Sequence, residues 1–489
     1  MSPRSRTSAC DGGVCSGRSE SVKYSSEGDR DPKGSLVYPS KKKRNITMSK
    51  YKSSCVRLLV LSALLPFAAM SPNGIASEKD AVIENSVKTR EARIEWWRDA
   101  RFGMFVHWGP VSLTGKEISW SRYGLGPPKR GKNPDWNHPQ VREYDTLYTK
   151  WNPVKFDADE WAQIAKDAGM RYVVFVVKHH DAFCLFDSEL TDHKITSPKS
   201  PFGRDITAEV VKAFREKGLG VGLYYSLWDW RHPDYFTDNH ARYTKFMHGQ
   251  IRELLSNYGK IDIMWFDAWV LHKGGDKHIG HWDTFDLVDM MMKLQPGIII
   301  NDRAGVLLDF DTSAEGRVGK HNKKHAWETC MTLGRQWSWK PNDRIKSLKQ
   351  CIHNLVRVVG GDGNLLLNTG PMPDGRIEPR QAERLREIGQ WLKAHGEAIY
   401  GTRGGPFPPG KWGASTQKGN KVYIHVLQWP AETLSLPPIP RKVVNSTSMS
   451  GGEVSVEQTD KSLIIEVPES DRDPIDTVIV LELDKPVAP

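Results

Sequence analysis

Hydrophobic residues between positions 88 and 403 follow two alternating patterns. Short runs rich in β-branched residues predict strands, and the stretches between them show the spacing of amphipathic helices. The predicted strands are 102–107, 172–178, 220–225, 261–266, 297–301 and 365–368. The clearest predicted helices are 158–168, 206–216 and 242–257. Repeated strand–helix units over this length predict an α/β fold, with a (β/α)8-like (TIM) barrel as the commonest closed form.

The pattern changes after the Gly- and Pro-rich segment 404–410, which has the composition of a linker. The runs 421–427, 462–467 and 476–483 cluster β-branched residues and are separated by turn residues, without an intervening helical pattern. Residues 404–489 are therefore predicted to form a C-terminal antiparallel β-sandwich, after a barrel at 88–403.

The N-terminus shows neither pattern. Residues 1–47 are polar and without apolar period, as expected of a disordered or mis-called upstream segment. Within 48–77, basic residues precede the apolar run 58–70, and small residues follow it. This is the order of a secretory signal peptide, and the run is too short to span a bilayer. We expect export to the periplasm or the medium without a membrane anchor; a buried hydrophobic helix is the alternative.

Composition narrows the functional classes. The formal net charge of +10 is concentrated in residues 1–77, which hold +8, so the remaining chain has no basic excess for nucleic acid. Beyond residue 77 the cysteines are Cys184, Cys330 and Cys351, whose spacing fits neither a disulfide framework nor a zinc site. We therefore predict no metal and no cofactor. The eighteen Trp residues suit either core packing or stacking on sugar rings.

Polar side chains follow the predicted strands, where barrel enzymes place their chemistry. His107 ends the first predicted strand, His179 and His180 follow the second, and Asp267 follows the fourth. Asp267 lies within the segment IDIMWFDAW (261–269), so it is flanked by aromatic residues as a nucleophile for an anomeric carbon would be. The alternative role for Asp267 is a helix N-cap.

The segment KHHD at 178–181 allows a second interpretation. A metal-dependent hydrolase would use His107, His179, His180 and Asp181 as ligands. Neighbouring histidines on an extended strand point to opposite faces, which disfavours a shared ion. Neutral imidazoles equally suit hydrogen bonds to a polyhydroxylated ligand.

General acid/base catalysis needs a second carboxylate. Asp309, Asp311, Glu315 and Glu328 are the candidates, and spacing alone does not choose among them. Glu315 lies in the segment DTSAEG, which we predict to be a flexible loop.

Several longer motifs occur in a fixed order: ARFGMFVHWG (100–109), YDTLY (144–148), KHHDAF (178–183), GLYYS (222–226), WFD (265–267), NDR (301–303), WETC (327–330) and GNLLLNTGP (363–371). Together they resemble the α-L-fucosidases of glycoside hydrolase family 29, over residues 90–485. The resemblance implies a barrel followed by a β-sandwich, and a retaining exo-glycosidase that acts on fucosylated glycans without a cofactor.

The resemblance also implies residue roles. Asp267 matches the nucleophile, Glu315 is the first choice for the acid/base and Glu328 the second. The residues that match the fucose-binding set are His107, Trp120, His179, His180, Tyr224 and Arg303, with Tyr225 in place of Tyr224 if the strand register differs by one. Many family members have Glu before the pocket Trp, whereas Ser119 precedes Trp120 here, so Glu117 is a possible substitute.

Two further functions stay open on the sequence. A related α-glycosidase for a sugar such as L-galactose would differ at the pocket for the sugar's C6 group. A carbohydrate-binding protein without activity would have lost a carboxylate, and here both Asp267 and Glu315 are present. The glycosidic linkage, the parent glycan and the oligomeric state do not follow from the sequence.

Overall fold

The computed structural model describes residues 73–123, 137–267 and 281–487. Residues 1–72, which include the predicted upstream segment and most of the predicted signal peptide, lie outside the described residues. Within the described ranges no helix combines the length and the apolar character that crossing a bilayer requires.

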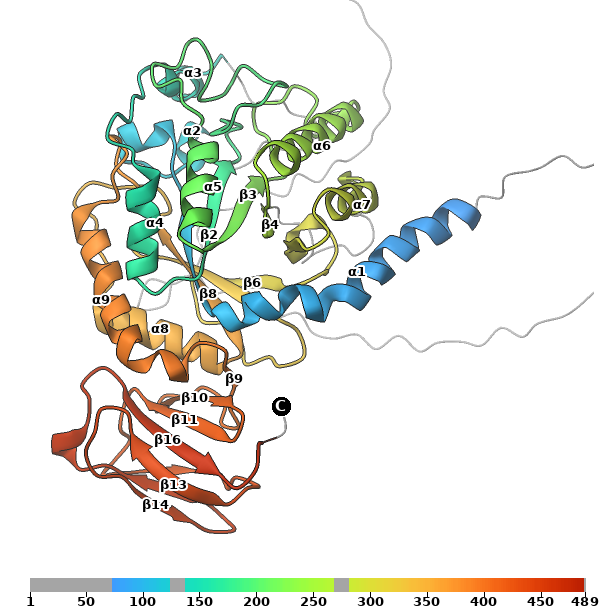
Figure 1. The fold of residues 1–489 in the computed structure, drawn as a ribbon. Coiled ribbons are helices and arrows are strands. Elements are labelled where there is room, and N and C mark those ends of the chain that lie inside the picture. The colour runs from blue at the N-terminus through green and yellow to red at the C-terminus, as the bar shows by residue number, and fades with distance from the viewer. Residues whose placement is uncertain (1–72, 124–136, 268–280, 488–489) are drawn as a thin grey trace, which may run out of the picture. The chain divides into compact units, whose positions relative to one another are not determined.

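Eight parallel strands form one curled sheet in the order β5-β4-β3-β2-β1-β8-β7-β6 (Figure 1). Their bounds are β1 Phe102–Val106, β2 Tyr172–Lys178, β3 Gly220–Ser226, β4 Ile263–Asp267, β5 Ile299–Ile300, β6 Asp311–Glu315, β7 Trp327–Thr332 and β8 Gly363–Thr369. The edge strands β5 and β6 meet at an isolated parallel bridge between Asn301 and Phe310. The predicted barrel-like α/β fold is confirmed.

Helices lie outside this sheet (Figure 1). They are α1 Asn73–Ala100, α2 Trp120–Tyr123, α3 Pro139–Asp145, α4 Ala158–Asp167, α5 Ile206–Glu216, α6 His240–Asn257, α7 Thr284–Leu294, α8 Leu348–Gly360 and α9 Pro379–His395. Side-chain caps fix several of their starts. The Asp205 carboxylate accepts the amide of Ala208 in α5, and Ser347 and Gln350 form a capping box at α8. Such a cap contributes about 1 kcal/mol.

Apolar side chains fill the inside of the barrel as a layer separate from the core under the helices. Phe105, Tyr224 and Trp265 belong to this inner cluster, together with Trp97 of α1. The carbonyl of Trp97 accepts a hydrogen bond from the side chain of Asn364, near the start of β8. Helix α1 therefore covers the amino-terminal end of the barrel, and the carboxyl-terminal end is left for a site.

The C-terminal residues form two antiparallel sheets, ordered β13-β16-β11-β10-β9 and β12-β15-β14. Their strands are β9 Arg403–Gly404, β10 Gly413–Lys418, β11 Lys421–Val426, β12 Thr433–Leu436, β13 Val443–Ser448, β14 Ser455–Gln458, β15 Leu463–Glu466 and β16 Thr477–Leu483. The two sheets share one core that contains Ile424, Leu434, Ile465 and Ile479. The predicted β-sandwich is confirmed.

One local prediction is wrong. The segment 311–315, predicted to be a flexible loop, is strand β6. Its sequence DTSAE has no hydrophobic run, and it is extended because it pairs with β7, where Glu315 lies opposite Cys330. Glu315 is consequently held at the end of a strand.

Candidate active site

A cavity opens at the carboxyl-terminal end of the barrel strands. Its lining side chains are Phe105, His107, Trp120, His179, His180, Tyr224, Trp265, Asp267, Arg303, Glu315, Cys330 and Trp337. Eight of the nine side chains expected to form the site are among them, and Glu328 is the exception. Segments far apart in the sequence therefore meet in one place. This agrees with the prediction made from the polar residues at the ends of the strands.

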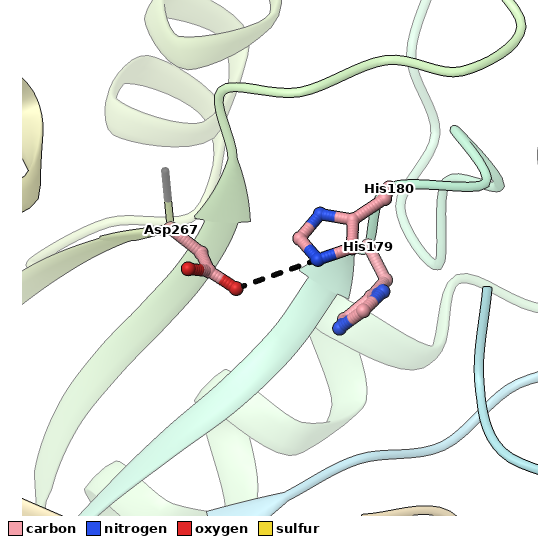
Figure 2. A group of neighbouring side chains, drawn as sticks. All are labelled: His179, His180 and Asp267. Carbon is pink, nitrogen blue, oxygen red and sulfur yellow. Dashed lines mark ion pairs between the residues drawn. The ribbon is translucent and has the colours of Figure 1, made fainter. Parts of the chain in front are cut away.

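Asp267 is the last residue of β4 and is held by donors on both oxygens. The Tyr224 hydroxyl donates to Oδ2 at 2.6 Å, and Nη1 of Arg303 donates to Oδ1 at 2.5 Å. Nε2 of His180 lies 3.6 Å from Oδ2 (Figure 2). Burial acts to raise the pKa of Asp267, but Arg303, His180 and Tyr224 together outweigh it, so the pKa lies below its usual value. The carboxylate is thus ionised and fixed in orientation.

Arg303 connects two carboxylates. It lies in the short helix η4 (Asp302–Ala304), and its Nε donates to the Thr312 hydroxyl at 3.0 Å. While Nη1 contacts Asp267, Nη2 donates to Oε2 of Glu315 at 3.1 Å. One planar guanidinium therefore sets the position of both acids.

Glu315 differs from Asp267 in its exposure to solvent. Its side chain is 46% exposed, against 14% for Asp267. Asp267 accordingly lies inside the cavity and Glu315 at its mouth, where both water and a departing group have access.

The imidazole of His107 has a defined tautomer. Its Nδ1 lies 2.7 Å from Oδ1 of Asn368, and the amide nitrogen of Asn368 donates to the carbonyl of Trp337. Because this fixes Oδ1 of Asn368 as the acceptor, Nδ1 of His107 carries the proton and Nε2 is an acceptor. Burial lowers the pKa of His107 to about 3, so the ring is neutral.

His179 and His180 are each held by a serine. Nδ1 of His179 lies 2.6 Å from the Ser119 hydroxyl, and Nδ1 of His180 lies 2.6 Å from that of Ser226. Burial lowers the pKa of both rings, that of His180 to about 4. Both imidazoles are neutral hydrogen-bonding groups near neutral pH, and each has its Nδ1 occupied.

Aromatic rings form much of the wall. Tyr224 stacks against His179 and Trp265, with centroid distances of 5.4 and 5.5 Å. Trp120, in α2, is 36% exposed and packs edge-on against Trp230 at 5.2 Å. A half-open indole beside neutral imidazoles provides an apolar face and polar edges together, which is what a sugar ring needs.

The sequence did not single out four lining residues: Phe105, Trp265, Cys330 and Trp337. Phe105 and Trp265 each precede a predicted site residue by two positions on a strand, so the alternation of side chains could have indicated them. Trp337 lies outside the strands and carried no such signal. Its amide nitrogen donates to the Glu117 carboxylate at 2.9 Å.

Several expected residues lie elsewhere. Glu117 accepts backbone amides of the segment that contains Trp337 and does not line the cavity. The Tyr225 hydroxyl donates to Gln250, away from the cavity, so Tyr224 is the residue that faces it. Glu328 is buried below the cavity, 1% exposed.

The rival metal site is only partly assembled. Among the described residues, His179, His180 and Asp267 have ligand atoms within 4.8 Å of one another (Figure 2). Asp181 instead accepts the Tyr144 hydroxyl at 2.5 Å. Since Arg303 already supplies the cation beside Asp267, these residues do not fit a divalent ion well.

Comparison with known proteins gives a consistent result. A family model described as alpha-L-fucosidase matches residues 70–397. Plasma alpha-L-fucosidase of Homo sapiens is 29% identical over 408 residues, which cover 76% of this chain and 85% of that protein. That of Rattus norvegicus is 30% identical, covering 68% and 77%.

Two solved structures are similar as well. Alpha-L-fucosidase isoenzyme 1 from Paenibacillus thiaminolyticus is 36% identical with a TM-score of 0.71, covering 81% of this chain and all 100% of that one. A family 29 alpha-L-fucosidase from Bacteroides thetaiotaomicron, trapped as a covalent intermediate with 2-fluoro-fucosyl fluoride, is 29% identical with a TM-score of 0.69, covering 80% and 96%.

Proposed function

Since this chain belongs to the α-L-fucosidase family, glycoside hydrolase family 29, we propose that it hydrolyses α-L-fucosides with retention of configuration, using Asp267 as the nucleophile and Glu315 as the acid/base. The observation that carries these roles is the pair of contacts from Arg303 to both carboxylates. Adjacent nitrogens of one guanidinium are compatible with the close carboxyl pair, about 5–5.5 Å apart, of retaining glycosidases.

In the first step Asp267 attacks the anomeric carbon and the bond to the leaving oxygen breaks. Glu315 gives its proton to that oxygen, and a covalent fucosyl-enzyme forms. Arg303 and Tyr224 keep Asp267 ionised and oriented before the attack, because both donate hydrogen bonds to its carboxylate. Water at the exposed side of the site then loses a proton to Glu315, attacks the same carbon and releases Asp267.

The neutral ring atoms are suited to hold the sugar. Nε2 of His107 can accept from a hydroxyl, and His179 and His180 provide further polar edges. Trp120 offers its exposed face at the mouth. We assign these side chains, with Tyr224 and Arg303, to substrate binding.

Organisation and location follow the same proposal. We assign catalysis to residues 88–403, the β-sandwich to 404–489 and export to a signal peptide at 48–77, with the protein acting in the periplasm or the medium on fucosylated glycans. Mass determination of the exported protein tests the signal peptide, because cleavage near Ala76 fixes the first residue of the mature chain.

The main test is turnover of a panel of α-linked aryl glycosides by the chain from residue 78 onward. α-L-Fucoside should be the best substrate, and an α-L-galactoside tests the alternative sugar. Asp267→Gly should abolish turnover while the protein keeps its thermal unfolding transition. Near-normal activity of Asp267→Gly on an aryl α-L-fucoside would refute the nucleophile.

A further inference from the structure

Glu328 is a buried acid with neutral partners. It lies on β7 inside the barrel, and its two oxygens accept from different residues: Oε1 from the indole nitrogen of Trp265 at 2.9 Å and Oε2 from the Tyr172 hydroxyl at 2.5 Å. Burying a carboxyl group among neutral groups is costly, so a hydrophobic residue would be the simpler filling for a barrel interior. This free-energy cost suggests that the Glu328 carboxyl group has a function beyond packing.

Trp265 connects Glu328 to the nucleophile. The Arg303 guanidinium lies over its indole, 4.8 Å from the ring centroid, and Tyr224 stacks on the indole at an interplanar angle of 19°. These are the two side chains that donate to Asp267. Both partners of the nucleophile therefore rest on one ring, and the orientation of that ring contributes to where they lie.

We propose that Glu328 is a positioning residue for the nucleophile: by accepting the indole N–H of Trp265 it fixes the ring on which Tyr224 and Arg303 rest, and through them the carboxylate of Asp267. This inference rests on the proposed function. Glu328 touches neither the cavity nor Asp267, so its effect on the reaction is indirect. A displacement of about 1 Å at a reacting group costs on the order of 10²-fold in rate, so a modest tilt of the indole is enough to matter.

Tyr172 contacts Glu328 from the other side. Its ring occupies space that Gly103 of β1 leaves open, since a Cβ at that position would lie 2.4 Å from the ring. Tyr172 does not line the cavity, and its hydroxyl contacts Oε2, not the oxygen that holds Trp265. Loss of that hydroxyl leaves the bond to Trp265 in place, which makes Tyr172→Phe a matched control.

Three substitutions separate positioning from packing in the full chain. Glu328→Leu removes the acceptor, and Glu328→Asp withdraws the carboxyl group by one methylene while keeping an ionisable acid. Glu328→Gln keeps an acceptor for Trp265 and can donate its amide to the Tyr172 oxygen, so it is the rescue variant. The readout is the rate of covalent labelling by 2-fluoro-fucosyl fluoride, which reports bond formation at the nucleophile alone, followed by intact mass. Affinity for L-fucose is measured in parallel.

We expect Glu328→Leu and Glu328→Asp to label about 10²-fold more slowly than the wild type, with fucose affinity much less affected. Glu328→Gln and Tyr172→Phe should label at close to the wild-type rate. If Glu328→Leu does not fold, Glu328→Asp carries the comparison. The proposal is overturned if both label as fast as Tyr172→Phe, or if Glu328→Gln is as slow as they are. A wild-type chain that is not labelled at all would instead refute the proposed function.

Discussion

The hydroxyl of Ser119 lies 2.6 Å from Nδ1 of His179, in the position where the family resemblance led us to expect a glutamate. The same hydroxyl accepts the backbone amide of Asp181 at 2.9 Å. Ser119 has a left-handed backbone, with φ of 56°, and its side chain is buried. It therefore acts from behind the cavity wall by fixing the imidazole, and leaves Nε2 of His179 for the ligand.

Removing this hydroxyl should weaken sugar binding and leave the acids untouched. Ser119→Ala loses a buried hydrogen bond of about 0.5–1.5 kcal/mol, so KM for an aryl α-L-fucoside should rise by roughly threefold to tenfold with a smaller change in kcat. Steady-state kinetics measure the split. Ser121→Ala, which loses a bond to the Glu117 carbonyl nearby, is the control. A fall in kcat with unchanged KM would contradict this role.

The dependence of activity on the leaving group tests whether Glu315, rather than Glu328, is the acid/base. For Glu315→Ala we expect a loss of about 10²–10⁴-fold on substrates with poor leaving groups and a smaller loss on activated aryl fucosides. Azide should restore part of the activity on the activated substrates, because the cavity mouth is open to a small anion once the side chain is removed. If azide has no effect on Glu315→Ala, the assignment of the acid/base to Glu315 fails.

Chelation should leave activity unchanged. The oxygens of Asp267 are occupied by Arg303 and Tyr224, and Asp181 is bonded to Tyr144, so catalysis by these side chains does not need a metal. Activity on an aryl fucoside after dialysis against EDTA is the measurement, with a zinc hydrolase treated in parallel. Activity that disappears on dialysis and returns with an added divalent ion would support the metal-dependent alternative.

Glu328 should make stability depend on pH. Burial raises its pKa from 4.5 to about 7, so between these values the folded chain holds a proton that the unfolded chain has released. The free energy of unfolding should therefore fall as pH rises through this window, by at most about 1.4 kcal/mol per pH unit. The side chain of Glu328→Gln does not titrate, so its stability lacks this pH dependence. The Tm of Glu328→Gln relative to that of the wild type should therefore be higher at about pH 8 than at about pH 5. A Tm difference between Glu328→Gln and the wild type that falls as pH rises would contradict the raised pKa.

Strands with a continuous apolar run were predictable, because burial on both faces of a parallel sheet requires such a run. The bounds of β2 match the predicted 172–178, and its seven residues are all buried. Strand β6 was not predictable, because its polar sequence is extended only through pairing with β7. Local composition misleads wherever a distant partner determines the conformation.

The residues of the site also fall into those that the strand pattern predicted and those that it did not. His107 and His179 directly follow strands and Asp267 ends one, so the fold class alone predicted that they would meet. Trp337 reaches the cavity through contacts between its segment and Glu117, 220 positions away in the sequence. The position of Glu328 depends on which face of β7 is turned inward, and the strand sequence WETCMT, in which hydrophobic and polar residues do not alternate regularly, did not reveal that face.

The barrel closes where its edge strands β5 and β6 meet, and this position has a consequence for how such an enzyme can diversify. Asp267 ends β4, which pairs along β3, whereas Glu315 ends β6, an edge strand with a register shift against β7. Substitutions at the edge can therefore accumulate and reshape the leaving-group side while the sugar-holding half stays constant. We expect natural variants to drift in aglycone preference sooner than in the sugar they recognise.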